Sequence, residues 1–143
     1  MNALPRADGW AALSGLYLSD ARFPQAFFCL EEGLLHRPED AVALVRCADV
    51  AYSIGGADAF RAALGMYATA VRLTQGTLPR AIFGMLAAAA RAAASRGAEK
   101  GDEFGPTAKV AMEAAATALR ALFPEGSAEA CAVRATIRAT GVE

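Results

Sequence analysis

WAALSGLYLSDARFPQAFFCLEEGLLHRP, residues 10–38, is the stretch that decides the fold, because large and small side chains recur in it at fixed intervals. Trp10, Leu13 and Tyr17 are three and four residues apart, which places them on one face of an α-helix. Such a face has to be buried against another element. We therefore expect Trp10 to be buried and Trp10→Ala to cost about 3–5 kcal/mol of stability.

The second half of the stretch predicts a second helix. Ala26, Leu30 and Gly33 lie on one face of it. The small residues at 26 and 33 let two helix backbones approach closely, and Leu30 fills the remaining groove. Pro38 ends the helix because it has no N–H to donate and its ring clashes with the preceding turn. The stretch therefore predicts a helical hairpin.

These intervals are the pattern of the tetratricopeptide repeat. The spacing W-x2-L-x3-Y-x8-A-x3-L-x2-G-x4-P defines a first repeat over about residues 7–40. A second repeat follows over about 41–77, and its second helix carries the small–large–small set Ala63, Tyr67 and Ala70. It is three residues longer than the first, and the excess falls at a Gly-Gly turn.

In the second repeat, Leu44 and Cys47 take the positions of Trp10 and Leu13. A divergent third pair is predicted over about 79–122. Its first helix starts at Pro79, residues 96–105 form a charged, Gly-rich loop, and Pro106 opens the second helix.

A last helix, about 127–139, has Ser127 as its N-cap and Glu129 in its first turn, and it covers the open end of the stack. We therefore expect one all-α domain over residues 1–143. It is a short right-handed solenoid of stacked hairpins, closed by a C-terminal capping helix.

Composition narrows the classes of function. Fourteen basic and fifteen acidic residues give a net charge of -1, so no field attracts nucleic acid. The three cysteines form no CxxC pair and have no His close in sequence, which favours a reduced, intracellular setting over disulfides or zinc. The most apolar window, 81–90, is shorter than the ~20 residues of a membrane span. Any membrane association is therefore expected to be indirect.

No constellation of catalytic residues is visible, and we predict that the chain is not an enzyme and has no cofactor. His36 lies near a helix end without a nucleophile or carboxylate partner. Cys29 and Cys47 occupy small apolar positions of the repeat pattern and are expected to be core thiols. The Gly55-Gly56 pair lacks the Lys and Ser/Thr of a phosphate loop.

The first helices of the repeats predict a groove for a partner. Chaperone-binding repeats carry Lys, Arg and Asn at these positions, whereas here the set is mostly apolar and suits an amphipathic or extended apolar segment. The predicted groove residues are Leu18, Val45, Asp49, Tyr52, Ile82 and Leu86. The alternative is that these side chains are covered by neighbouring repeats or by a missing N-terminal half.

Three features beyond the generic repeat resemble one family. AFFCLEEGLL at 26–35, AYSIGG at 51–56 and RAIFGML at 80–86, together with MYATAVRLTQ at 66–75, are similar to the C-terminal half of subunit 2 of the endoplasmic reticulum membrane protein complex. The resemblance covers most of residues 7–123. The N-terminal half that the resemblance leads us to expect is missing before the Trp10 repeat, which fits a fragment, a divergent short form or an incomplete gene model.

The resemblance implies a scaffold on the cytoplasmic face of the endoplasmic reticulum membrane. Members of the family hold cytosolic segments of membrane-embedded subunits and a neighbouring soluble subunit, in a complex that inserts tail-anchored and multi-pass proteins. No binding residue can be carried over from the family. The alternative, from the repeat pattern alone, is a free-standing cytosolic adaptor or chaperone cofactor that binds a partner helix or peptide.

Overall fold

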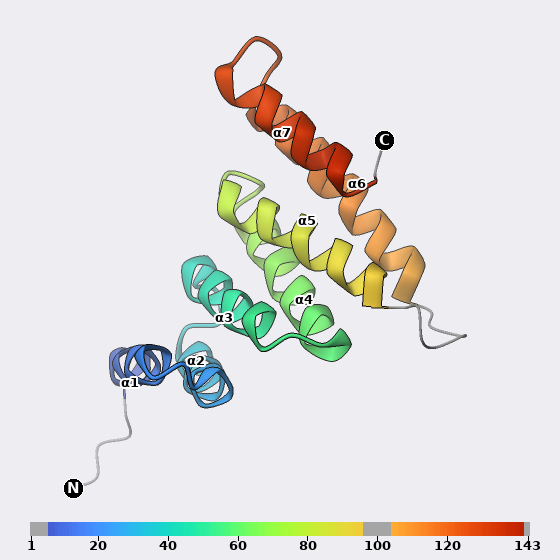
Figure 1. Cartoon of the computed structure of the whole chain (residues 1–143). Helices are drawn as coiled ribbons and strands as arrows, with labels where there is room; N and C mark the ends of the chain where they lie inside the picture. Colours follow the sequence, from blue (N-terminus) through green and yellow to red (C-terminus); the bar gives the residue numbers. More distant parts are fainter. Residues whose placement is uncertain (1–5, 96–103, 142–143) are drawn as a thin grey trace, which may run out of the picture.

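The computed structural model describes residues 6–95 and 104–141 of the chain. Within these ranges it consists of α-helices without a strand (Figure 1), which confirms the predicted all-α class. The helices are α1 (Ala7–Ser19), α2 (Phe23–His36), α3 (Ala41–Ile54), α4 (Ala57–Leu73), α5 (Pro79–Ala94), α6 (Phe104–Leu122) and α7 (Ala128–Ala139).

Local sequence explains the boundaries of α3. The Asp40 carboxylate accepts hydrogen bonds from the backbone N–H groups of Val42 and Ala43, at 3.1 and 3.0 Å, and so caps the start of the helix. Gly55 and Gly56 join α3 to α4 with φ values of 78° and 93°. Residues with a side chain adopt this region only under strain, so the glycines fix the turn.

Near the C-terminus, one predicted boundary holds and another shifts. The Ser127 hydroxyl accepts a hydrogen bond from the Ala130 N–H at 3.2 Å and caps α7, as predicted. Helix α6 begins at Phe104, two residues before Pro106, which the sequence predicts to open it. Pro106 is tolerated because N–H groups in the first turn of a helix have no partner within it. The predicted loop at 96–105 lies outside the described residues, except for its last two, which belong to α6.

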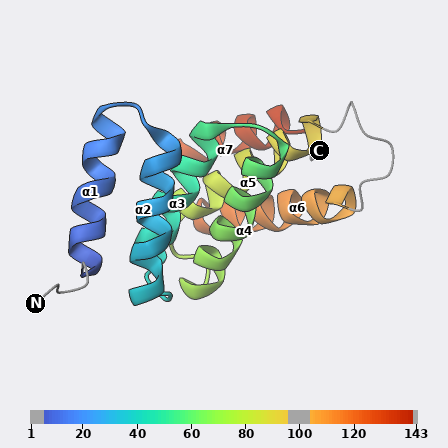
Figure 2. The same ribbon diagram turned by 90° about the horizontal axis from the view of Figure 1, so that it is seen from below.

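The helices pack in chain order. Each one packs against the next, and α3 also contacts α5. Helix α1 lies at one end of the array and packs mainly against α2, so much of its surface faces outward (Figure 2). Helices α1 and α7 lie at opposite ends of the molecule (Figure 1).

Two clusters of buried side chains form the core. The larger one draws residues from α3 to α7, including the fully buried Ile82 and Leu119. The smaller one joins α2 to α3 and consists of Ala26, Leu30, Cys47 and Val50. Alanines fill many buried positions, which lets the helices approach closely but leaves each contact with little apolar area.

Candidate functional site

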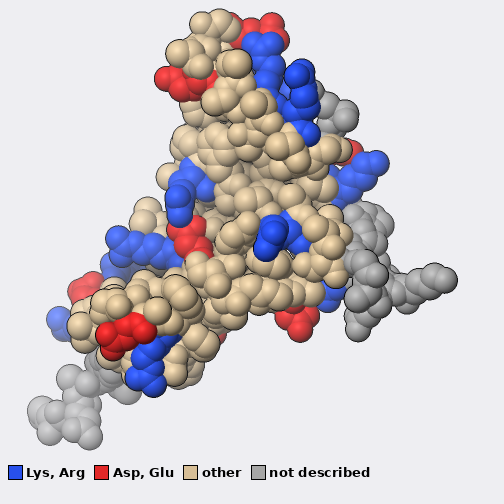
Figure 3. Space-filling model, viewed as in Figure 1, with Lys and Arg blue, Asp and Glu red and all other residues tan. Residues whose placement is uncertain are grey.

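Charge is spread thinly over the surface. On the face shown in Figure 3, Lys and Arg side chains alternate with Asp and Glu side chains and are separated by broad uncharged areas. This face therefore presents no continuous basic surface of the kind that tracks a nucleic acid backbone.

Five of the six small–large–small positions of the predicted repeats lie in the interior, and Gly33 is half-buried. Ala26, Leu30, Ala63, Tyr67 and Ala70 are each at most 8% exposed. The first two belong to the cluster between α2 and α3, and the other three belong to the larger cluster.

The first-helix positions are less protected. Trp10, Leu13 and Tyr17 are half-buried, so the expectation of a buried Trp10 is wrong. Trp10 is only half-buried because α1 is the end helix of the array and packs mainly against α2. A β-carbon at Gly33 would lie 3.6 Å from the Trp10 Cβ atom, so the small residue lets α1 and α2 pack closely. Pro38 follows the end of α2 and is exposed.

The predicted partner groove is closed over part of its length. Val45, Ile82 and Leu86 lie in the larger core cluster and are 6%, 0% and 1% exposed. Because α3 and α5 contact each other directly, the side chains between them fill the space instead of lining a groove. Helical spacing shows which residues share a face, but not how closely two faces approach. Leu18 is exposed on α1, away from these residues.

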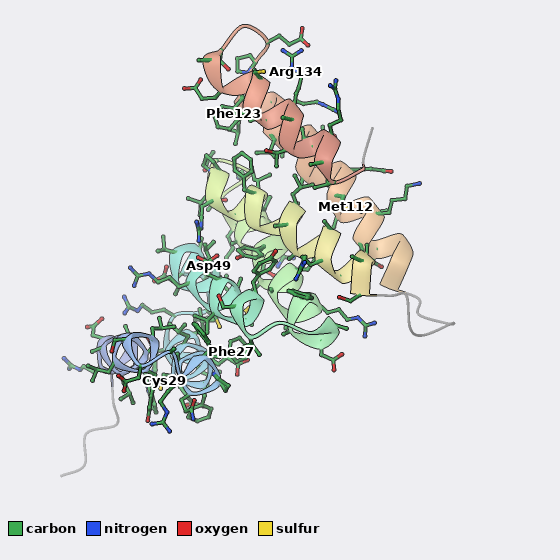
Figure 4. All side chains as sticks on the ribbon, in the orientation of Figure 1. Phe27, Cys29, Asp49, Met112, Phe123 and Arg134 are labelled. Atoms are coloured by element: carbon green, nitrogen blue, oxygen red, sulfur yellow. The ribbon has the colours of Figure 1, made fainter. Side chains whose placement is uncertain are left out.

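The remaining groove residues, Asp49 and Tyr52, line a pocket. Asp49 lies on α3 where this helix faces α4 and α5 (Figure 4). Its Oδ1 atom accepts a hydrogen bond from the Tyr67 hydroxyl of α4, and its Oδ2 atom accepts one from Arg80 Nη2 of α5 at 2.7 Å. We call Asp49, Tyr67 and Arg80 the Asp49 cluster. It ties together three successive helices.

Burial decreases across the Asp49 cluster from the inside outward. Tyr67 is 3% exposed, whereas the side chains of Asp49 and Arg80 are 32% and 67% exposed. Burial, and then the bond to Asp49, raises the pKa of Tyr67 above its ordinary value of 10.0. The bond to Asp49 also raises the pKa of Arg80. Tyr67 is thus a neutral internal donor, and Arg80 is an oriented cation at the surface.

The Asp49 cluster forms one side of an open pocket of about 250 Å³, which we call the α3–α5 pocket. The other sides are the half-buried rings of Tyr52 and Phe83 and the small residues Gly84 and Ala87. The pocket therefore combines aromatic walls with a fixed guanidinium.

Arg80 and Phe83 are absent from the set that the sequence predicts for the groove, and the Asp49 cluster makes the pocket partly polar. One signal points to them. Asp49 is a carboxylate on an otherwise apolar helix face, and such a group requires donors nearby. The sequence contains that requirement but does not show which donors meet it.

A second exposed feature is an apolar hollow of about 340 Å³ at the free side of the first two helices, which we call the α1–α2 surface. Its lining residues are Trp10, Leu13, Tyr17, Pro24, Gln25, Phe28 and Cys29. The Trp10 and Phe28 rings meet edge to face with centroids 6.2 Å apart, yet Phe28 is 56% exposed. An apolar surface of this kind is typical of a contact with another protein.

The next pair of helices shows how an equivalent face is covered inside the array. Leu44 and Cys47 of α3, in the positions of Trp10 and Leu13, are 9% and 0% exposed. They are covered because α2 packs on α3, with Leu30 in the same cluster as Cys47. The α1–α2 surface therefore corresponds to a face that a neighbouring helix covers in the next pair.

The buried cysteines are poor nucleophiles. Burial raises the pKa of Cys47 to about 12, with a smaller effect of Glu31, and it raises the pKa of Cys29 with a smaller effect of Glu32. Among the described residues, no three or more His, Cys, Asp or Glu side chains are placed to hold a metal ion. Over the same ranges of the chain, none of the helices combines the length and apolar character needed to cross a membrane.

The fold and these two surfaces define a class of protein: an all-helical array with an apolar end and a charged, aromatic pocket, both suited to contacts with other proteins. Over 78 residues the chain is 30% identical to ER membrane protein complex subunit 2-B of Xenopus laevis, and equally to ER membrane protein complex subunit 2 of Xenopus tropicalis. The match covers 54% of this chain and 26% of each relative. No family model matches the chain.

Proposed function

We propose that the chain is a non-enzymatic scaffold subunit of the ER membrane protein complex. In this role it supports insertion of tail-anchored and multi-pass membrane proteins by binding other subunits. The observation that carries the proposal is the similarity to subunit 2 of that complex over 78 residues. Tyr67 and Arg80 add support, because they come from two different stretches that carry the resemblance, and both side chains donate hydrogen bonds to Asp49.

The proposed architecture is a tetratricopeptide-like, right-handed solenoid in a single domain over 1–143. Its units are repeats at about 7–40 and 41–77, a divergent pair at about 79–122 and a capping helix at about 127–139. The packing of each helix against the next supports this arrangement, as do the buried small–large–small sets.

The scaffold is proposed to act on the cytoplasmic face of the endoplasmic reticulum membrane. It reaches the membrane indirectly, through cytosolic segments of membrane-embedded subunits and a neighbouring soluble subunit. The α1–α2 surface is the proposed place for a helix of that neighbour, because α2 covers the equivalent face of α3. The balance of fourteen basic and fifteen acidic residues supports protein partners over nucleic acid.

The proposal is tested by affinity purification of the tagged chain from detergent-solubilised endoplasmic reticulum, with mass spectrometry of what is retained. We expect membrane-embedded subunits of the complex. Phe28→Lys places a charge on the α1–α2 surface and should reduce their recovery, whereas Leu73→Lys, at a residue 40% exposed on α4, should not. Recovery of soluble chaperones alone contradicts the proposal.

The second candidate function is a free-standing cytosolic adaptor or chaperone cofactor. The α3–α5 pocket favours it, since an aromatic pocket with a fixed guanidinium can hold a peptide without a membrane complex. Cell fractionation separates the two functions, because a subunit sediments with membranes and an adaptor stays in the soluble fraction.

A further inference from the structure

Helix α5 carries a stripe of four residues that continues the α3–α5 pocket. Arg80, Gly84, Ala87 and Arg91 are separated by four, three and four residues, so they lie on one face of the helix. At a rise of 1.5 Å per residue, the two arginines are about 16 Å apart along the axis. Gly84 and Ala87 lie between the two arginines and line the pocket, while the Tyr67 ring fills the space next to Gly84. We call this strip, with a cation at each end, the furrow.

Both arginines are oriented by neighbouring side chains. Arg80 donates one of its five N–H groups to Asp49 Oδ2 at 2.7 Å, so the other four remain for a ligand. The Arg91 guanidinium lies 5.3 Å from the centre of the Phe60 ring. No acidic side chain of the described ranges pairs with Arg91, and those ranges give Arg80 no acidic partner besides Asp49. The furrow thus has a surplus of positive charge.

The walls beside the furrow are aromatic. Tyr52 of α3 lines the pocket and packs against Phe60, with ring centroids 5.3 Å apart, and Phe83 lines the other side. A ligand that fits this surface therefore needs apolar side chains between its negative charges.

We propose that the α3–α5 pocket and the stripe on α5 bind an extended acidic and apolar segment of a partner protein. One carboxylate pairs with Arg80, a second pairs with Arg91, and an apolar side chain lies on Ala87 beside the Tyr52 ring. In an extended chain, carboxylates five residues apart span about 16 Å, which matches the two arginines. The inference rests on the proposed function only in that a scaffold requires such a partner segment.

A nucleic acid fits the same furrow less well. It brings a charge at every nucleotide, whereas the furrow offers two cations in a chain of net charge -1. A protein segment with two spaced carboxylates matches the number of cations.

Fluorescence anisotropy with a labelled peptide tests the proposal on the full chain. The probe has two glutamates five residues apart with Leu and Phe between them, and its matched peptide has glutamines instead. We expect the unchanged chain to bind the glutamine peptide at least about tenfold more weakly than the glutamate peptide. We expect a loss of the same size when the glutamate peptide binds the Arg80→Gln variant. Arg91→Gln leaves the Asp49 cluster intact and should also weaken binding. Arg134→Gln, at an exposed residue on α7 (Figure 4), makes the same charge change and should not.

Equal affinity for the two peptides, no binding of either, or full binding by both Arg80→Gln and Arg91→Gln overturns the proposal. The proposal is also overturned if an oligothymidylate displaces the probe at the same concentration as the unlabelled peptide does. That result would indicate a general anion site. If the chain binds the probe but recovers no membrane-embedded subunits, the proposed site stands and the proposed function is wrong. If the chain recovers membrane-embedded subunits but does not bind the probe, the proposed function stands and the proposed site is wrong.

Discussion

The ring of Tyr67 on α4 occupies the space that a side chain at Gly84 on α5 would need. A β-carbon at Gly84 would lie 2.5 Å from Cζ and 2.7 Å from Cδ1 of the ring. The ring is not free to move away, because it is 3% exposed and its hydroxyl is bonded to Asp49. Gly84 therefore permits the approach of α4 and α5 on which the Asp49 cluster depends.

We predict that Gly84→Ala destabilises the protein. The clash with the Tyr67 ring costs about 1–3 kcal/mol as overpacking, while the better helix propensity of alanine returns up to about 1 kcal/mol. The net loss should be about 1–2 kcal/mol, measured from the midpoint of urea unfolding at constant slope.

Gly65 on α4 provides the matched control. It lies within a helix, is exposed, and has nothing within 4 Å of the position of a β-carbon. Gly65→Ala should therefore stabilise the protein by about 0.5–1 kcal/mol, from helix propensity alone. If both substitutions shift the midpoint in the same direction, the Tyr67 ring does not limit the approach of α5.

Tyr67 also predicts a loss of stability in alkali. The folded state raises its pKa above 10.0, so it holds the phenol proton more tightly than the unfolded chain does. This contribution is complete below about pH 10 and is lost as the pH rises through the folded-state pKa. Tyr67→Phe should cost about 1–2 kcal/mol at neutral pH through the lost hydrogen bond. Its stability should fall less steeply than that of the unchanged protein above pH 10.

The quantity to compare is the difference in unfolding free energy between the two proteins at each pH. The thiols of Cys29 and Cys47 are present in both, so their own alkaline contributions cancel in that difference. A difference that stays constant from about pH 8 to about pH 11 means that folding does not depend on the Tyr67 proton.

The half-buried position of Trp10 predicts a modest role in stability. Trp10→Ala should cost about 1–2 kcal/mol, because much of the ring already contacts solvent. Leu86→Ala removes a side chain that is 1% exposed in the larger core cluster and should cost about 2–5 kcal/mol. Urea unfolding of the two variants ranks them directly. A larger loss for Trp10→Ala would mean that α1 is covered in solution, for example by self-association.

Local signals in the sequence fix most of the helices but not the site. The capping side chain of Ser127 and the Gly55-Gly56 turn act within a few residues, so the sequence shows their effect directly. Asp49 and Arg80 are 31 residues apart, and their ion pair follows no period. This ion pair and the burial of Ile82 both depend on how closely α3, α4 and α5 approach one another. Helical spacing does not encode the distance between helices.

The three cysteines predict a simple pattern of chemical reactivity. Cys131 is exposed on α7, whereas Cys29 and Cys47 are 2% and 0% exposed and have raised pKa values. With a thiol reagent such as DTNB at mildly alkaline pH, one of the three thiols should react at once. The other two should react at the rate at which the core opens, and all three should react together in denaturant. Cys131→Ser should remove the fast phase alone, and a fast phase that persists in this variant would show that Cys29 or Cys47 is accessible in solution.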